Sequence, residues 1–235
     1  MAYGNSFQRT TPIVLNLIII NTLVFFAQGM FAGTSILVGG QEESNRVYEL
    51  FALHHYKSEF FRPYQIVTHM FMHGSFMHLL FNMLGLWMFG SMIERIWGPK
   101  RFLTFYLICV LAAAFTQMGS YAVEFANVNY GSPDRMNNLK YLISQYSSTV
   151  GASGAIMGVM AAYAYLFPNT QLFIMPIPFP IKAKWAIMGY IALDVFGGIY
   201  RVPNDNIAHF AHVGGAVAGF LLVFFWNKTK KQTFY

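Results

Sequence analysis

The apolar stretch that decides the fold is residues 151–168, which read GASGAIMGVMAAYAYLFP. A helix over residues 151–167 would be about 25 Å long at 1.5 Å per residue, short of the roughly 30 Å hydrocarbon layer of a bilayer. Because Pro168 ends this helix on one side, Ser153 in the first turn is expected to lie below the opposite membrane surface. There the free N–H groups and the positive end of the helix dipole favour negative charge on a serine oxygen.

Composition indicates that the chain is a membrane protein. Hydrophobic residues make up 56% of it and charged residues 10%, with a mean hydropathy of +0.44, whereas soluble domains carry about 25% charged residues. The apolar residues lie in long blocks, which favours membrane spans over one large core. We predict an all-α, polytopic bundle in a single domain, since open strand edges cannot be satisfied in hydrocarbon. Six transmembrane helices are expected at 12–32, 75–92, 102–122, 151–167, 184–200 and 208–226.

Basic residues predict the orientation of these spans. The run from Pro12 to Ala32 follows Arg9 as in a secretory signal, but it is longer than the roughly 7 to 15 residues of a signal core, so an uncleaved helix is expected. With both termini in the cytoplasm, that side holds nine of the fifteen basic residues, as the positive-inside rule requires. They are Arg9, Arg95, Lys100, Arg101, Lys182, Lys184, Lys228, Lys230 and Lys231.

The same topology explains the net charge of +6, so no nucleic-acid partner is expected. The absence of a transit peptide and the compact six-span plan favour a bacterial inner membrane.

The segment 33–74 mixes aromatic and charged residues and is expected to fold against the membrane. In the segment 123–150, Ser132-Pro133 predicts the start of a short helix over 134–146. Cys109 is the single cysteine, which excludes an intramolecular disulfide and favours a buried thiol.

The last span supplies a histidine that could act on Ser153. It contains Ala211-His212-Val213-Gly214-Gly215, and His212 follows His209 by three residues, about one helical turn. The glycines that follow His212 form a small-residue face that can approach the Gly154 and Gly158 face of the fourth span until the backbones nearly touch. Ser153 and His212 would then meet, with a neutral imidazole as general base. The alternative is that the small residues and the histidine merely pack helices.

A third cluster lies at the outer end of the second span. His78 and Asn82 are four residues apart and share one helical face. They offer imidazole and amide N–H donors that could form an oxyanion hole beside the backbone N–H of Ser153. His69 and His73 are also four apart, which is a metal-ligand spacing if that stretch is helical.

The order of these motifs closely resembles the rhomboid intramembrane serine proteases. The resemblance runs from Phe61 to Phe220 and is specific because the motifs lie on separate spans. The motifs are His73, His78 and Asn82, then Glu94-Arg95, then Gly151-x-Ser153-Gly154, then Ala211-His212-x-Gly214-Gly215.

The resemblance implies an intramembrane endopeptidase that needs no cofactor or metal and cleaves transmembrane-helix substrates in the lipid bilayer. It implies a Ser153–His212 dyad without an acidic third member, an acyl-enzyme intermediate, and an oxyanion hole formed by His78, Asn82 and Ser153. The residues implied to support the site are Gly151, Gly154, His73 and Gly215. It also implies a membrane-embedded first loop with Arg62 in its core, and lateral entry of substrate near spans two and five.

The chain departs from the family pattern at several positions. Met157 stands where many relatives carry an aromatic residue that stacks on the catalytic histidine, so the orientation of His212 needs another explanation. Phe61 replaces a tryptophan, the 123–150 connection is longer than in compact relatives, and Asp194 in span five has no assigned partner.

Two other functions fit parts of the pattern. A non-proteolytic rhomboid-like protein that binds membrane clients is the first, although its relatives typically lose the serine or the histidine. A metal or haem protein is the second; its ligands would be His69, His73, His209 and His212, which have no carboxylate neighbours in sequence. The oligomeric state is left open.

Overall fold

The computed structural model describes residues 10–31, 35–38, 41–127, 148–174, 177–200 and 207–230. Helices occupy all six predicted spans, so the helical membrane fold is confirmed. The helices in these spans are α1 (Pro12–Phe31), α4 (Phe76–Gly85) with the π-helical η2 (Leu86–Gly90) and α5 (Ser91–Trp97), α6 (Pro99–Asn127), α8 (Ser153–Leu166), α9 (Ala183–Tyr200) and α10 (His209–Lys230).

Four of these helical segments are long and apolar enough to cross a membrane. They are Pro12–Phe31, Phe76–Trp97, Pro99–Glu124 and His209–Lys228. Helix α8 has 14 residues and is therefore short, as predicted, whereas α9 has 18 residues. The helix predicted over 134–146 lies outside the described residues.

The segment between α1 and α4 folds into small pieces of structure instead of a linker. Strands β1 (Ser35–Val38) and β2 (Gln41–Asn45) form an antiparallel pair. Strand β3 (Leu53–His54) pairs with β4 (Ser148–Thr149), which precedes α8 in the chain. The other elements of this segment are α2 (Arg46–Phe51), α3 (Gln65–Thr68) and the short 3-10 helix η1 (His69–Phe71). A further antiparallel pair, β5 (Gln171–Leu172) with β6 (Ile181–Lys182), lies between α8 and α9.

A buried glutamine holds this first loop together. Gln65 is fully buried, and its Nε2 donates to the backbone carbonyls of Glu49 at 2.9 Å and Phe60 at 2.8 Å. Arg62, which was expected in the loop's core, is exposed and donates to the carbonyls of Glu59 and Phe61. The arginine therefore fixes the surface turn, while Gln65 satisfies the carbonyls inside the loop.

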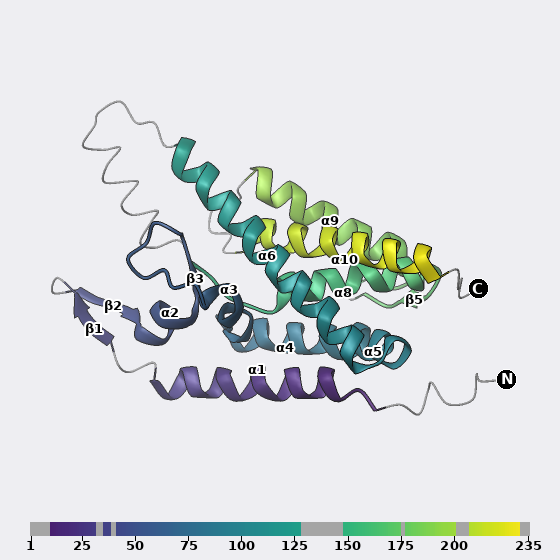
Figure 1. Cartoon of the computed structure of the whole chain (residues 1–235), viewed down its shortest axis with the longest axis horizontal. Coiled ribbons are helices and arrows are strands. Elements are labelled where there is room, and N and C mark those ends of the chain that lie inside the picture. Colours follow the sequence, from purple (N-terminus) through teal and green to yellow (C-terminus); the bar gives the residue numbers. More distant parts are fainter. Residues whose placement is uncertain are drawn as a thin grey trace.

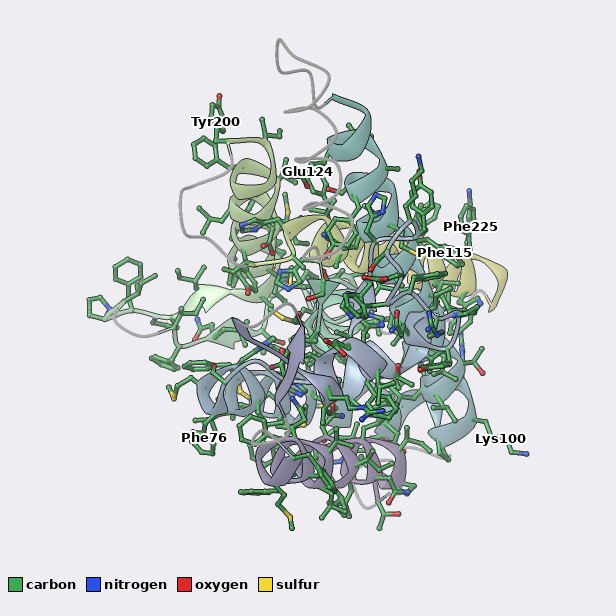
Figure 2. The ribbon with its side chains drawn as sticks, turned by 90° about the vertical axis from the view of Figure 1, so that its left-hand side faces the viewer. Phe76, Lys100, Phe115, Glu124, Tyr200 and Phe225 are labelled. Atoms are coloured by element: carbon green, nitrogen blue, oxygen red, sulfur yellow. The ribbon has the colours of Figure 1, made fainter. Side chains whose placement is uncertain are left out.

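Helix α8 occupies the centre of the bundle, with α4 on one side and α6 and α10 on the other, while α9 flanks α10 (Figure 1). The first residue of α1 and the last of α10 lie at the same end of the bundle, which an even number of spans requires (Figure 1). Strands β1 and β2 and helix α2 lie at the other end. Large apolar side chains cover the outside of several helices, including Phe76, Phe115, Tyr200 and Phe225 (Figure 2).

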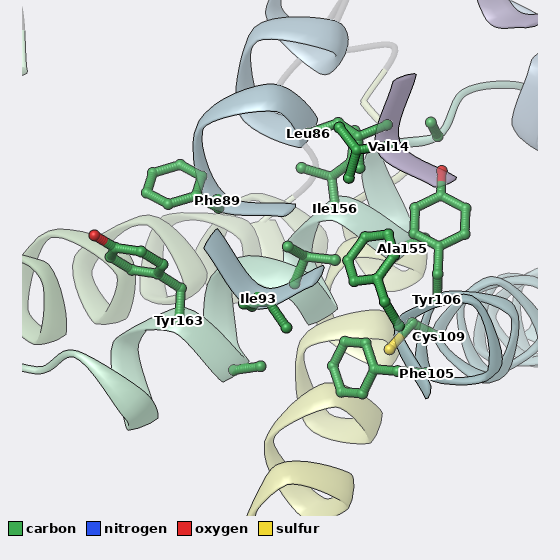
Figure 3. Packing of buried hydrophobic residues seen from close by; sticks show 14 of the residues in the cluster. Val14, Leu86, Phe89, Ile93, Phe105, Tyr106, Cys109, Ala155, Ile156 and Tyr163 are labelled. Atoms are coloured by element: carbon green, nitrogen blue, oxygen red, sulfur yellow. The ribbon is translucent and has the colours of Figure 1, made fainter. Parts of the chain in front are cut away.

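Glycines bring α8 and α10 into backbone contact, which confirms the predicted approach of the two small-residue faces. A methyl group on Gly215 would overlap the carbonyl oxygen of Gly154, and one on Gly219 would overlap that of Gly158. A methyl on Gly158 would also lie 2.5 Å from Cys109 Sγ of α6. The buried thiol therefore packs against the middle of α8, within a core that includes Tyr106 (Figure 3).

A carboxylate ties α5 to the start of α1. Glu94 is 1% exposed and accepts hydrogen bonds from the backbone N–H groups of Ile13 at 2.9 Å and Val14 at 2.8 Å. These N–H groups have no carbonyl partner within α1, and a negative charge there also stabilises the helix dipole. Glu94 thereby acts as a cap supplied from another helix.

Candidate active site

Ser153 and His212 meet between α8 and α10. Ser153 is the first residue of α8, and its Oγ lies 2.7 Å from His212 Nε2. His212 is 6% exposed, so its imidazole is largely shielded from bulk solvent. The predicted contact between the two side chains is therefore confirmed, and its geometry is that of a nucleophile hydrogen-bonded to a general base.

Gly151 shapes the turn that precedes the serine. Its φ is +122°, a conformation that L side chains rarely adopt, and its N–H donates to the carbonyl of His69 at 2.9 Å. A methyl group here would lie 2.8 Å from Cε1 and Nε2 of His78. The glycine is thus required both by the backbone and by the close approach of the imidazole.

His78 and Asn82 project from α4 towards the same place. The N–H of Gly74 points at His78 Nδ1 at 3.4 Å, which favours the tautomer that carries its proton on Nε2. Ser75 caps α4 by accepting from the N–H of His78. Asn82 is 6% exposed, and its Nδ2 has no hydrogen-bond partner within the part of the chain that the structure describes. A buried donor in that state is ready to bind an incoming oxygen.

His73 lies behind His78 and is held through its backbone. Gln28 of α1 donates to the His73 carbonyl at 3.2 Å and accepts from its N–H at 3.1 Å, and the Tyr48 hydroxyl donates to the same carbonyl. The rings of His73 and His78 are 5.1 Å apart in a T-shaped arrangement. Burial, with a smaller effect of the neighbouring His78, lowers the pKa of His73 to about 4, so this imidazole is neutral near pH 7.

Asp194 of α9 acquires two partners that the sequence did not assign. Its Oδ1 lies 2.8 Å from Nδ1 of His209 and 3.0 Å from Nδ1 of His212. The aspartate is 3% exposed. The family pattern implies a dyad without an acidic neighbour, so this carboxylate is a departure from it. The sequence indicated a partner for Asp194 only by placing a carboxylate inside an apolar span, where it is costly unless it is paired.

Met157 packs in an apolar cluster between the helices of the site. It is 2% exposed and belongs to a small apolar cluster with Ala161 and Ala216, against which Ile191 packs. Its side chain therefore fills space between α8, α9 and α10. The two ring nitrogens of His212 are held by its contacts with Asp194 and Ser153.

A cavity of about 1000 Å³ gives access to these groups. Ser153, His212, His78 and Asn82 all line it, together with Tyr190 and other residues of α9 and α10. Its size is sufficient for an extended segment of a peptide chain. The four predicted catalytic and oxyanion residues are thus brought together around one space.

The histidines considered as metal ligands are used in other ways. His69 Nδ1 lies 2.9 Å from the carbonyl of Gln65, and the short 3-10 helix ends at Phe71, so His73 is not one α-helical turn from it. His209 and His212 both contact the Asp194 carboxylate through Nδ1. Among the described residues, no group of three or more His, Cys, Asp or Glu is arranged to hold a metal ion.

Comparisons with known proteins agree with the motifs. The model of the Rhomboid domain family matches residues 61–228. Rhomboid protein 1, mitochondrial, of Saccharomyces cerevisiae is 28% identical over 167 residues, which cover 71% of this chain and 43% of that protein. Presenilin-associated rhomboid-like protein, mitochondrial, of Bos taurus is 34% identical over 150 residues, 63% of this chain and 34% of that protein.

A bacterial relative is matched over more of its length. Rhomboid protease AarA of Providencia stuartii is 27% identical over 217 residues, which cover 89% of this chain and 70% of that protein. The chain thus spans less than half the length of the two mitochondrial relatives. The comparisons and the four long apolar helices agree on an integral membrane protein.

Proposed function

Because the chain belongs to the rhomboid family, we propose that it is an intramembrane serine endopeptidase whose substrates are transmembrane helices. The observation that carries the proposal is the 2.7 Å contact between Ser153 Oγ and His212 Nε2 in a cavity inside the bundle. A relative named as a protease, matched over 89% of this chain, supports it.

The first half of the reaction forms an acyl-enzyme. Ser153 Oγ bonds to the carbonyl carbon of the scissile peptide while His212 Nε2 takes the hydroxyl proton. The negative charge on the former carbonyl oxygen is stabilised by Asn82 Nδ2, His78 and the backbone N–H of Ser153, which has no intrahelical partner. His212 then delivers its proton to the leaving amine as the C–N bond breaks.

The second half regenerates the serine. A water molecule from the cavity attacks the ester carbon, His212 takes one of its protons, and the proton returns to Ser153 Oγ as the C–O bond breaks. A stable helix hides its carbonyls in internal hydrogen bonds, so substrates are expected to carry helix-breaking residues near the cut. We propose an integral membrane protein with both termini cytoplasmic, as the distribution of basic residues predicts. The relatives named as mitochondrial conflict with the expected bacterial inner membrane.

The proposal is tested with purified protein in proteoliposomes and a tagged single-span substrate. Ser153→Ala is expected to abolish cleavage, whereas Ser91→Ala, which changes a buried serine of α5 outside the cavity, is expected to cleave as the wild type does. A fluorophosphonate should label the wild type at Ser153. Unlabelled, non-cleaving wild-type protein that still captures the substrate would favour a client-binding protein and overturn the proposal.

A further inference from the structure

A buried carboxylate lies behind the candidate base and belongs to a different helix. Asp194 comes from α9, whereas His212 and Ser153 come from α10 and α8. The carboxylate oxygen Oδ1 contacts two Nδ1 atoms of α10, at 2.8 Å for His209 and 3.0 Å for His212. Its other oxygen, Oδ2, has no hydrogen-bond partner in the described part of the chain.

These contacts determine which nitrogen of His212 carries the proton. An ionised carboxylate can only accept hydrogen bonds, so His212 must donate to it from Nδ1–H. In the neutral imidazole, Nε2 is then the acceptor, which is the state needed to take a proton from Ser153 Oγ at 2.7 Å. When the ring becomes positively charged during the reaction, the carboxylate stabilises that charge at close range.

The face of α9 that carries Asp194 also leaves space for the His209 side chain of α10. Gly197 and Gly198 follow Asp194 by three and four residues and therefore lie on its side of the helix. A methyl group on Gly197 would lie 2.5 Å from Cε1 and 2.6 Å from Nε2 of His209. The imidazole of His209 can rest against this backbone because these positions have no side chain.

We propose that Asp194 is the positioning residue of the Ser153–His212 pair, and that His209 holds the Asp194 carboxylate in place. This inference rests on the proposed protease function and adds a third and a fourth member to the dyad that the family pattern implies. Because the carboxylate and the base lie on different helices, the site is complete when α9 packs against α10. A displacement of α9 would leave the orientation of His212 to its contact with Ser153.

Asp194→Asn is the first test, since it keeps the size of the side chain and removes its charge. We expect kcat to fall by about 100-fold or more, since neutralising the carboxylate of a serine-protease triad lowers kcat by about 10⁴-fold. The rate of fluorophosphonate labelling should fall in parallel, with KM unchanged. Labelling does not depend on entry of a protein substrate, so a parallel loss in both rates identifies an effect on the nucleophile. A purely structural aspartate would lower the thermal midpoint while sparing kcat in the folded protein.

A second variant keeps the test informative if Asp194→Asn fails to fold. Gly197→Ala displaces the His209 imidazole and leaves the carboxylate present, so about a 10-fold loss in kcat is expected. Gly189→Ala on the same helix is the matched control, because a methyl there meets nothing within 4 Å. Wild-type kcat in Asp194→Asn, or equal kcat in the two alanine variants, would overturn the inference while the protease proposal stands. Wild-type protein that neither cleaves nor is labelled overturns the protease proposal itself.

Discussion

Replacing Gly158 by alanine tests whether the backbone contact between the helices sets the geometry of the site. Gly158 lies on α8, five residues after Ser153, where α6, α8 and α10 meet. A methyl group there would lie 2.5 Å from Cys109 Sγ and 2.8 Å from the carbonyl oxygen of Gly215. Neither neighbour can yield alone, because one belongs to a buried side chain and the other to the backbone of α10.

The size of the effect follows from these distances. Non-bonded heavy atoms are comfortable at about 3.5 Å, so α8 must move by up to about 1 Å from its neighbours. A displacement of that size between Ser153 on α8 and His212 on α10, now 2.7 Å apart, is expected to lower kcat by about 100-fold. Overpacking should also cost about 1–3 kcal/mol of unfolding free energy, offset by about 1 kcal/mol from the higher helix propensity of alanine.

The assay compares cleavage of a single-span substrate and thermal unfolding in detergent for three proteins. Gly189→Ala measures the helix-propensity gain without a clash, since a methyl there contacts nothing within 4 Å. Cys109→Ala combined with Gly158→Ala removes the sulfur but leaves the Gly215 carbonyl at 2.8 Å and the Cβ of residue 109 at 2.9 Å, so only partial recovery of kcat is expected. If Gly158→Ala matches Gly189→Ala in both kcat and thermal midpoint, the reasoning about the close contact is wrong.

Three further predictions follow from other parts of the structure. Glu94→Gln weakens the cap on α1 and should lower the unfolding free energy by about 1–2 kcal/mol, measured by thermal unfolding, with kcat preserved. Burial lowers the pKa of His69 and of His73 to about 4, below the ordinary 6.5, so the unfolded chain binds more protons between these values. Stability should therefore be highest above pH 6.5 and fall as the pH drops towards 4, and His73→Gln should flatten that slope in denaturant titrations. Gly151→Ala forces a side chain into a positive-φ position against the His78 imidazole, so cleavage should be lost, whereas Gly119→Ala, with open space around it, should cleave normally.

The parts of the fold that could be predicted are those set by local pattern. Blocks of apolar residues predict the spans, and small residues four apart, such as Gly154 with Gly158 and Gly215 with Gly219, predict helix faces that can touch. Helices are present at the predicted positions, four of them long and apolar enough to cross a membrane, and the two glycine faces touch. The meeting of Ser153 with a histidine follows from the same faces, because the two helices can approach along only a narrow stripe. The catalytic role of the pair remains a prediction.

Long-range polar contacts could not be read from the sequence. Gln28, Gln65 and Gln117 are buried, and each bonds backbone groups elsewhere in the chain. Gln117 Oε1 accepts from the N–H of Ala211 near the start of α10, although 94 positions separate them. No local periodicity or spacing around a glutamine predicts its hydrogen-bond partner, because that partner depends on how whole helices pack against one another. The π-helical stretch Leu86–Gly90 was missed for a related reason, because the expected span assumed a uniform helical repeat.

Asp194 lies between the features that local pattern predicts and the long-range contacts that it does not. It shows what cannot be predicted from one helix at a time. The sequence marks it as a polar residue in an apolar span, and Gly197 and Gly198 mark the face of α9 on which it lies. What the sequence cannot give is the rotation of α9 against α10, which decides whether this face meets His209 and His212. The space left by the two glycines answers that question, because an imidazole fills it. In this chain, the face of α9 that carries Asp194 and the two glycines is therefore the face on which a side chain of α10 packs.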